Sequence, residues 1–346
     1  MGYVLTGDLG GTNPRLAMVE TKQSTIVMKA SLDTAIDCSL VSHINQFLHD
    51  AAHRGFTTDI CCLAIAGVID AHEPIVLTNA AFSIDEQELK EQTMLQHIFL
   101  INDFEAIAYG IKSLDDNDER IVRLRKGKAK KGNEAIIGPG TGLGVSYLVE
   151  DQTGERSPYI VSPSIGGHSP VGVIPELSSL FSFVQKKLKT PSLPAEALVS
   201  GQGIKHLIMF LLSKRTVPKA LDKWCTLSQE LADDTRIRQA VDQGGDVGAL
   251  ISELYIYNKK ANIALNIFMS LLGLVVQSVA LHGLCRRGIY IAGGILPKNQ
   301  HLFDQPYFEE YFCLTWKHDV KSFLDSVPIY LVDDYDIALQ GCSSYV

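Results

Sequence analysis

The sequence lacks the two signatures that most often mark a nucleotide-binding protein. No G-x-x-x-x-G-K-[ST] segment occurs in its 346 residues, which excludes a P-loop. The glycines of residues 138–144 do not fit G-x-G-x-x-G, and a strand-like run follows them where a dinucleotide fingerprint would open a helix. Any phosphate site in this chain must therefore be built in another way.

Paired cysteines and charge are also scarce. No two of the seven cysteines are spaced C-x-x-C, and Cys61 and Cys62 lie inside an apolar run. We expect small buried thiols in a reducing cytoplasm and no zinc site. Charged residues make up 20% of the chain and its net charge is −8, so nucleic acid is not an expected partner. An acidic protein can still bind a nucleotide through backbone amides and Mg²⁺.

No segment is predicted to be a signal peptide or a membrane span. The residues around Met1 carry no basic region, and Asp8 interrupts the first apolar run. Residues 267–284 are apolar but include Ser270 and Gln277, and another strand-like run follows closely. We expect a buried core helix there, a cytoplasmic protein and no membrane partner.

Two glycine-rich turns each join a pair of strand-like runs. The first is Gly7-Asp8-Leu9-Gly10-Gly11-Thr12-Asn13, and the second is Gly138-Pro139-Gly140-Thr141-Gly142-Leu143-Gly144. Glycine lets backbone N–H groups point into a turn without a Cβ in the way, which is what an anionic phosphate requires. Asp8, at a strand end, is placed to hold Mg²⁺ or its waters. The alternative for each turn is an ordinary hairpin in which Asp8 bonds its own backbone.

A carboxylate follows a third apolar run. Residues 98–101 are all apolar and lead into Asn102-Asp103, so the Asp103 carboxylate is expected at the carboxyl edge of a sheet, where ligands bind in open α/β folds. Phosphoryl transfer to an alcohol needs such a group to accept the hydroxyl proton. The competing interpretation is that Asp103 caps a helix that begins at Phe104.

Hydrophobic periodicity predicts strands and helices in alternation, with the strand-loop-strand pattern beginning twice. Residues 114–133, which are rich in Arg and Lys, are expected to form a solvated hairpin or linker. The expected helices are residues 40–52, 84–97 with Ser83 as the cap, 104–111, 177–188, 195–212, 227–241, 247–284 with a break, and 335–341.

The order of these motifs resembles that of the bacterial glucokinases, members of the sugar kinase, actin and Hsp70 superfamily. The resemblance covers essentially the whole chain and includes Gly166-Gly167-His168 and Gly293-Gly294. It implies an α/β protein of two actin-like (ribonuclease H-like) domains with an interdomain cleft. The expected domains are residues 1–112 plus 334–346 and residues 113–333, with the last helix packed back on the first domain. Many members of the family are dimers, which leaves a homodimer possible.

The resemblance also implies an ATP site. The two glycine-rich turns would contact the phosphates, Gly293-Gly294 would lie against the adenosine, and Asp8 would hold Mg²⁺ through water. The implied nucleotide-binding residues are Asp8, Gly10, Gly11, Thr12, Asn13, Gly140, Thr141, Gly142, Gly293 and Gly294.

The sugar site that the resemblance implies departs from the family pattern at two positions. The implied sugar ligands are Asn79, Asn102, Asp103, His168 and Glu196. In the family's P-x-E-G-G-H loop, this chain has Ile165 in place of the glutamate, and Phe82 replaces the tryptophan of T-N-x-x-W. The loss of one carboxylate acceptor changes which hydroxyls can be paired.

These observations predict ATP-dependent phosphorylation of glucose to glucose 6-phosphate, the first step of glycolysis, with Asp103 as the general base on the C6 hydroxyl. Ile165 keeps two alternatives open: a kinase for a different hexose or amino sugar, and a catalytically silent sugar-binding regulator. The residues after His168 contain no cysteine-rich zinc loop and no basic helix-turn-helix precedes Asp8, which disfavours a repressor of the related ROK group.

Overall fold

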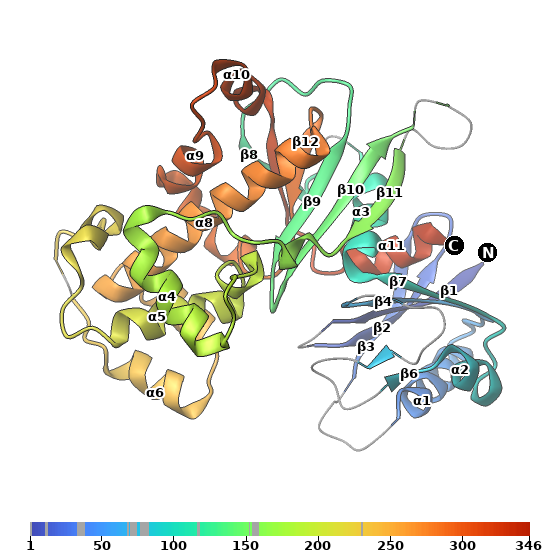
Figure 1. The fold of residues 1–346 in the computed structure, drawn as a ribbon. Coiled ribbons are helices and arrows are strands. Elements are labelled where there is room, and N and C mark those ends of the chain that lie inside the picture. The colour runs from blue at the N-terminus through green and yellow to red at the C-terminus, as the bar shows by residue number, and fades with distance from the viewer. Residues whose placement is uncertain are drawn as a thin grey trace. The chain divides into compact units, whose positions relative to one another are not determined.

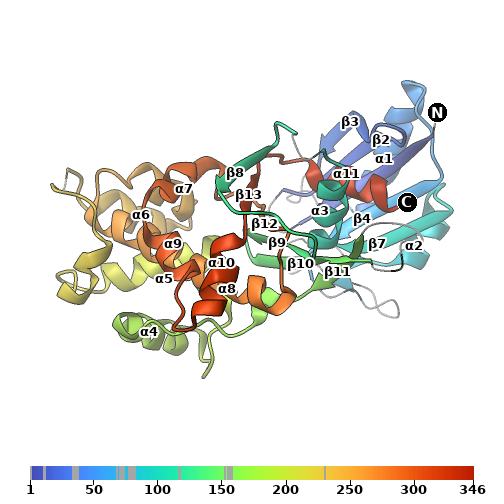
Figure 2. The ribbon, with the colours of Figure 1, turned by 90° about the horizontal axis from the view of Figure 1, so that it is seen from above.

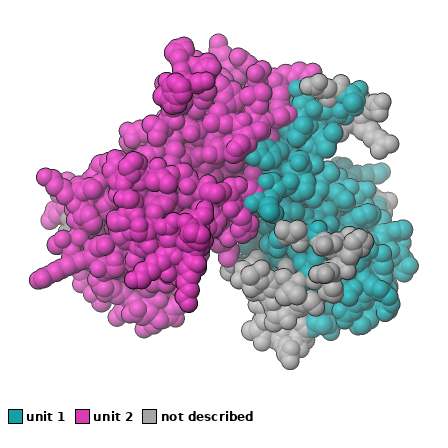
Figure 3. Space-filling view, viewed as in Figure 1, with its two compact units in different colours: residues 1–121, 146–165, 334–346 teal, residues 122–145, 166–333 magenta. Residues whose placement is uncertain are grey.

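The computed structural model describes residues 2–10, 13–32, 39–67, 69, 75–76, 83–115, 118–151, 153, 159–229 and 231–346. The chain forms two compact units (Figure 3). The first comprises Met1–Ile121, Ser146–Ile165 and Asp334–Val346, and the second comprises Val122–Val145 and Gly166–Asp333. The prediction of an α/β fold is confirmed by a five-stranded and a six-stranded mixed sheet. The domain limits expected from the sequence remain a prediction.

The first unit is built on the five-stranded sheet, in the order β3-β2-β1-β4-β7 (Figure 1). Its strands are β1 (Tyr3–Leu9), β2 (Arg15–Glu20), β3 (Thr25–Ser31), β4 (Ile60–Ile65) and β7 (His97–Asn102). The first three strands pair antiparallel, as the expected meander. Strands β1, β4 and β7 pair in parallel, so their carboxyl ends lie at one edge of the sheet.

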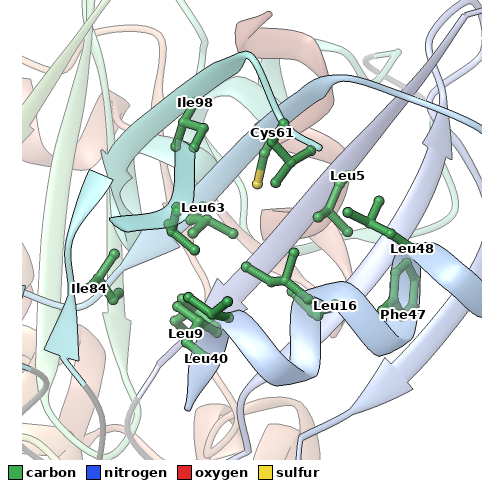
Figure 4. Packing of buried hydrophobic residues seen from close by; sticks show 14 of the residues in the cluster. Leu5, Leu9, Leu16, Leu40, Phe47, Leu48, Cys61, Leu63, Ile84 and Ile98 are labelled. Atoms are coloured by element: carbon green, nitrogen blue, oxygen red, sulfur yellow. The ribbon is translucent and has the colours of Figure 1, made fainter. Parts of the chain in front are cut away.

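The central strand β4 is apolar throughout because both of its faces are covered. Cys61 and Leu63 belong to a cluster with β1, β2 and helix α1 (Leu40–His53), part of which Figure 4 shows. Cys62 and Ala64, which alternate with them, pack with residues of helices α3 (Asp103–Lys112) and α11 (Ile337–Tyr345). The free thiols of β4 therefore serve as small apolar side chains.

Helix α11 returns to the start of the chain and lies beside α3 in both ribbon views (Figures 1 and 2). Its Cys342 Sγ lies 3.8 Å from the Gly7 carbonyl oxygen, although these residues are 335 positions apart. The two helices approach through glycines: a Cβ on Gly341 would lie 1.8 Å from the Ala106 carbonyl oxygen, and one on Gly110 would lie 2.4 Å from that of Ile337. The expected packing of the last helix on the N-terminal strands is confirmed.

The six-stranded sheet has the order β11-β10-β9-β12-β13-β8. Its strands are β8 (Ile121–Arg125), β9 (Glu134–Pro139), β10 (Leu143–Glu150), β11 (Tyr159–Ser164), β12 (Gly288–Ile291) and β13 (Ile329–Val332). Strand β12 pairs in parallel with β9 and with β13, so the segments that follow β9 and β12 leave the same edge.

The second unit carries helices α4 to α10. They are α4 (Ser178–Leu188), α5 (Gly201–Leu212), α6 (Thr235–Gln243), α7 (Val247–Glu253), α8 (Lys259–Gly283), α9 (Tyr307–Phe312) and α10 (His318–Ser326). Short 3₁₀ turns are η1 (Gly166–His168), η2 (Pro175–Leu177), η3 (Ala195–Ala197), η4 (Lys219–Trp224) and η5 (Pro297–Asp304). The remaining elements of the described chain are β5 (Ile75–Val76), β6 (Ser83–Ile84) and α2 (Glu86–Gln92), in the first unit.

Helix α8 is the one helix of the described residues that is long and apolar enough to cross a membrane. Of its most apolar 18-residue stretch, 83% is buried inside the structure. Polar side chains on its buried part bond within the structure: Ser270 accepts from the Trp224 indole N–H at 2.8 Å, and Gln277 donates to the Phe312 carbonyl at 2.9 Å. The prediction of a buried core helix is confirmed.

Some predicted helices begin later than expected, and for α2 and α5 a downstream residue supplies the cap. Asp85, not Ser83, caps α2, and its carboxylate accepts from the N–H groups of Gln87 and Glu88. Ser83 and Ile84 instead pair with β5. Ser200 caps α5, which leaves η3 as a separate turn, and α6 starts only at Thr235.

The basic segment was wrongly expected to be only a hairpin or linker, because it contains strand β8. In that strand, Arg125 donates to Glu309 at 2.7 Å and to the Val327 carbonyl at 2.7 Å. Arg120, just before it, bonds Asp118 and Asp334. Some of its positive charge is therefore used inside the fold.

Candidate active site

The carboxyl edge of the first sheet brings Asp8 and Asp103 together. Asp8 in β1 is opposite Ala64 of β4, and Ile65 of β4 is opposite Asn102, the last residue of β7. Asp103 follows directly as the first residue of α3. The topology therefore places both carboxylates at the carboxyl ends of β1 and β7, the two parallel strands on either side of β4, where ligands bind in such sheets.

Asn102, rather than Asp103, caps helix α3. Asn102 Oδ1 accepts from the N–H of Phe104 at 3.0 Å and of Glu105 at 3.3 Å, and its Nδ2 donates to the Gly67 carbonyl at 3.1 Å. Asp103 Oδ1 accepts from the Phe104 N–H at 2.9 Å. Asn102 supplies the helix cap, so Asp103 is not needed for that role. Asp103 Oδ1 bonds the Phe104 N–H, and Oδ2 takes no part in that bond.

The environment of Asp103 raises the pKa of its carboxyl to about 7. Burial is the largest cause, the negative charge of Asp8 adds to it, and the hydrogen bond from the Phe104 N–H partly opposes both. A carboxylate with a pKa near neutrality is suited to take a proton from an alcohol.

A buried arginine, which the sequence analysis did not single out, neutralises Asp8. The Arg15 guanidinium forms an ion pair with Asp8 Oδ2, donates to Asp336 Oδ1 at 2.8 Å and lies 3.8 Å from the centre of the Tyr335 ring. Asp8 Oδ1 accepts from the Gly10 N–H at 3.3 Å, as the hairpin alternative expected. Asp336 also pairs with the half-exposed Lys29, at 2.6 Å.

We expect Arg15→Lys to lower the free energy of unfolding by about 1–2 kcal/mol, because lysine cannot bond both carboxylates in the same fork. Lys29→Met removes the other cation from Asp336 and is the matched control. Since Lys29 is 42% exposed, its loss should change stability by less than about 1 kcal/mol. Urea denaturation of the two variants measures the difference, and equal midpoints would contradict the role given to Arg15.

In the second unit, two glycine segments meet at the edge formed by β9 and β12. The Ala292 N–H donates to the Ile137 carbonyl at 2.9 Å, directly before each segment. Gly293 has φ +93°, and a Cβ there would lie 2.7 Å from the Pro139 carbonyl oxygen. Gly140 and Gly294 face open space, with no atom within 4 Å of a built Cβ. The two predicted nucleotide segments are therefore neighbours, and part of each has room beside its backbone.

The second glycine-rich turn, residues 138–144, is held by its own backbone and by helix α5. The Gly140 N–H donates to the Gly142 carbonyl, and the Gly201 N–H at the start of α5 donates to the Gly140 carbonyl, both at 2.8 Å. Thr141 at the tip is exposed. We call residues 138–144, which are predicted to contact phosphate, the phosphate loop.

His168 and Glu196 lie on turns that reach the same loop. Glu196 Oε2 accepts from the Leu143 N–H at 2.9 Å, and Gly167 packs so closely that a Cβ would lie 1.9 Å from the Leu143 carbonyl oxygen. The Ala195 N–H donates to the Ser169 carbonyl at 2.8 Å, which joins the two turns. His168 is exposed at the end of η1.

The predicted site residues thus form one group in each unit. The first unit holds Asp8, Gly10, Asn13, Asn102 and Asp103, and the second holds Gly140, Thr141, Gly142, His168, Glu196, Gly293 and Gly294. Gly11, Thr12 and Asn79 lie outside the described residues. The ligand contacts of all these residues remain predictions.

The family model described as Glucokinase matches residues 5–346. The chain belongs to the glucokinase family. It is 31% identical to the glucokinase of Nostoc punctiforme over 348 aligned positions, which cover 99% of this chain and 98% of that protein.

Solved structures of the family share the fold. A glucokinase from an Antarctic psychrotroph is 28% identical, with a TM-score of 0.72 and coverage of 100% of this chain and 98% of that one. The glucokinase of Balamuthia mandrillaris, solved in complex with glucose, also has a TM-score of 0.72, at 22% identity and coverage of 99% and 92%. The predicted family and enzyme class, a glucokinase, are confirmed.

Among the residues that the structure describes, no three His, Cys, Asp or Glu side chains are grouped to hold a metal ion. The predicted ligand of Mg²⁺ is the Asp8 carboxylate, which would hold the hydrated ion of a magnesium nucleotide through water. Asp8 Oδ1, which among the described residues accepts the long bond from the Gly10 N–H, is the oxygen that would fit this task.

Proposed function

We propose that the chain transfers the γ-phosphoryl group of ATP to the C6 hydroxyl of glucose, in the cytoplasm, with Asp103 as the general base. The observation that carries the proposal is the environment of Asp103. It follows a parallel strand directly, Asn102 beside it supplies the helix cap, and its pKa is raised to about 7. Membership of the glucokinase family supplies the substrate class.

In the proposed reaction, the Asp103 carboxylate accepts the hydroxyl proton while the sugar oxygen forms its bond to the γ-phosphorus. The bond from that phosphorus to the bridging oxygen breaks, and ADP leaves. The phosphate loop and the first glycine-rich turn supply backbone N–H groups for the phosphates. When bound, Mg²⁺ supplies neutralising charge, and Asp8 would hold it through water.

A kinase for another hexose is the second candidate, because Ile165 stands where the family pattern has a glutamate. Ile165 is 58% exposed. An apolar side chain there cannot pair a sugar hydroxyl, whereas a site with a carboxylate can discriminate strongly by such pairing.

A coupled assay of ADP release with glucose, mannose, fructose and glucosamine tests the function. We expect glucose to give the highest kcat/KM. We also expect Ile165→Glu to lower the KM for glucose by about tenfold, as one recovered charged hydrogen bond would.

Ile165→Gln has a similar shape without the charge and is the control. A higher kcat/KM for another hexose would favour the second candidate, and turnover with none of them would overturn the kinase proposal.

A further inference from the structure

Leu143, the residue before the last glycine of the phosphate loop, is held on both of its backbone sides by the predicted sugar-binding turns. Its N–H donates to Glu196 Oε2 at 2.9 Å. Its carbonyl oxygen faces Gly167, whose missing Cβ makes the approach possible. The loop therefore cannot move at this residue without moving the Glu196 carboxylate.

Gly142 is required for this contact by space. A Cβ on Gly142 would lie 2.5 Å from Glu196 Oε2, yet its φ lies outside the left-handed region, so its backbone would accept alanine. Gly140, two residues earlier in the same loop, has no atom within 4 Å of a built Cβ. Alanine at Gly142 would therefore disturb the Glu196 contact, whereas alanine at Gly140 would change the same loop without touching Glu196.

The backbone around Glu196 is fixed to the same loop by a second path. Ser200 Oγ donates to the Glu196 carbonyl at 2.7 Å and accepts from the Gly203 N–H at 3.0 Å, as the cap of α5. Next to it, the Gly201 N–H donates to the Gly140 carbonyl. The side chain of Glu196 is thus the adjustable part of an otherwise fixed connection.

We propose that Glu196 couples sugar binding to nucleotide binding, with Oε2 holding the phosphate loop and Oε1 accepting from a sugar hydroxyl. This inference rests on the proposed function. A sugar that fixes the carboxylate also fixes the loop in the form that its N–H groups need for the phosphates. Each ligand then raises the affinity of the other by the same factor, as linkage requires.

Isothermal titration calorimetry measures this coupling without turnover. The ligands are the hexose selected by the assay above and a nonhydrolysable ATP analogue, AMPPNP with Mg²⁺, each titrated with and without the other. We expect the wild-type protein to bind each ligand at least about fivefold more tightly when the other is present.

The alanine pair gives the sharpest contrast. Gly142→Ala should weaken sugar binding in the absence of nucleotide by about tenfold or more and reduce the coupling factor to near one, because the new methyl displaces Oε2. Gly140→Ala should leave sugar binding without nucleotide within about twofold, since its methyl meets no neighbour. Equal sugar affinities for the two variants would overturn the inference.

Substitutions of Glu196 itself distinguish its positioning of the phosphate loop from its binding of the sugar. Glu196→Gln can still present an oxygen to the Leu143 N–H, so it should weaken sugar binding and leave AMPPNP binding without sugar unchanged. Glu196→Ala should weaken both. If Gly142→Ala fails to fold by circular dichroism, this second pair decides, and unchanged AMPPNP binding in Glu196→Ala would overturn the inference.

The inference and the function fail in different ways. Coupled binding of sugar and AMPPNP without any turnover would overturn the proposed kinase activity and leave the Glu196 link standing. Normal turnover with a coupling factor of one would do the reverse.

Discussion

We expect Asp103→Asn to lower kcat for sugar phosphorylation by about 10³-fold, the loss expected when a general base is replaced by an isosteric amide. The asparagine keeps the shape of the side chain and can still accept from the Phe104 N–H, so α3 and the sheet edge stay in place. Steady-state kinetics with saturating ATP and sugar measure the loss. A variant that kept a tenth of the wild-type kcat or more would exclude Asp103 as the base.

Glu105→Gln is the matched control, because Glu105 lies in the same first turn of α3 as Asp103. Both substitutions replace a carboxylate with an amide of the same length. Its pKa is also raised by burial, but it is not placed at the strand end. We expect its kcat to stay within about threefold of the wild-type value.

The pH dependence follows from the same residue. Because the pKa of Asp103 is about 7, the base is protonated below that pH, and wild-type activity should fall tenfold per pH unit on the acid side. The residual activity of Asp103→Asn should lack this limb.

The stability of the fold should fall as the pH rises, in contrast to the activity. The folded pKa of Asp103, about 7, is above the ordinary value of 3.8, so ionisation destabilises the fold. Its favourable contribution is complete below about pH 4 and is lost as the pH rises through 7. Asparagine does not titrate, so the Tm of Asp103→Asn should exceed that of the wild type by about 3 °C or more at pH 8, with little difference at pH 4.

Gly341→Ala should be the most destabilising of the glycine substitutions, by about 3 kcal/mol. Its Cβ would lie 1.8 Å from the Ala106 carbonyl oxygen and 2.7 Å from the Gly110 nitrogen. These are backbone atoms inside helix α3, which cannot turn aside as the end of a side chain would. The helices must separate, and the buried contacts of Cys342 and Ala338 with the sheet are lost with them.

Chemical denaturation followed by circular dichroism measures this loss. Gly248→Ala is the control, since Gly248 lies within helix α7 and the nearest atom to its built Cβ is at 3.5 Å, an ordinary contact. That change should raise stability by up to about 1 kcal/mol, the gain of alanine over glycine in a helix. A wild-type midpoint for Gly341→Ala would mean that α11 does not pack on α3 as described.

Local patterns in the sequence predicted much of this fold. The apolar run of β4 was correctly predicted to be a buried strand, whereas the run before Asn102 forms strand β7, in which Phe99 is exposed. Long helices such as α1 and α8 were also found, because their apolar spacing is sustained. The edge that carries Asp8 and Asp103 followed from the parallel strands.

Contacts between distant residues were the part that the sequence did not reveal. Arg15 lies in an apolar strand, and nothing near it indicates Asp336 as a partner, 321 residues later. Glu196 reads locally as the start of a helix, and its bond to Leu143 depends on how two turns meet. Strand β8 was missed because its charged side chains are paired across the fold, which outweighs their local preference for solvent.

The return of α11 to the first sheet has a consequence for biosynthesis. Because Cys342 rests against Gly7, the ribosome releases strands β1 and β4 long before it makes the helix that covers them. At a synthesis rate of about 5–20 residues per second, many seconds pass between the synthesis of Cys62 and Ala64 and that of the helix that covers them. This part of the fold can reach its final form only after residues 337–345 have been synthesised, and a chain that stopped before them would leave Cys62 and Ala64 without the contacts of α11.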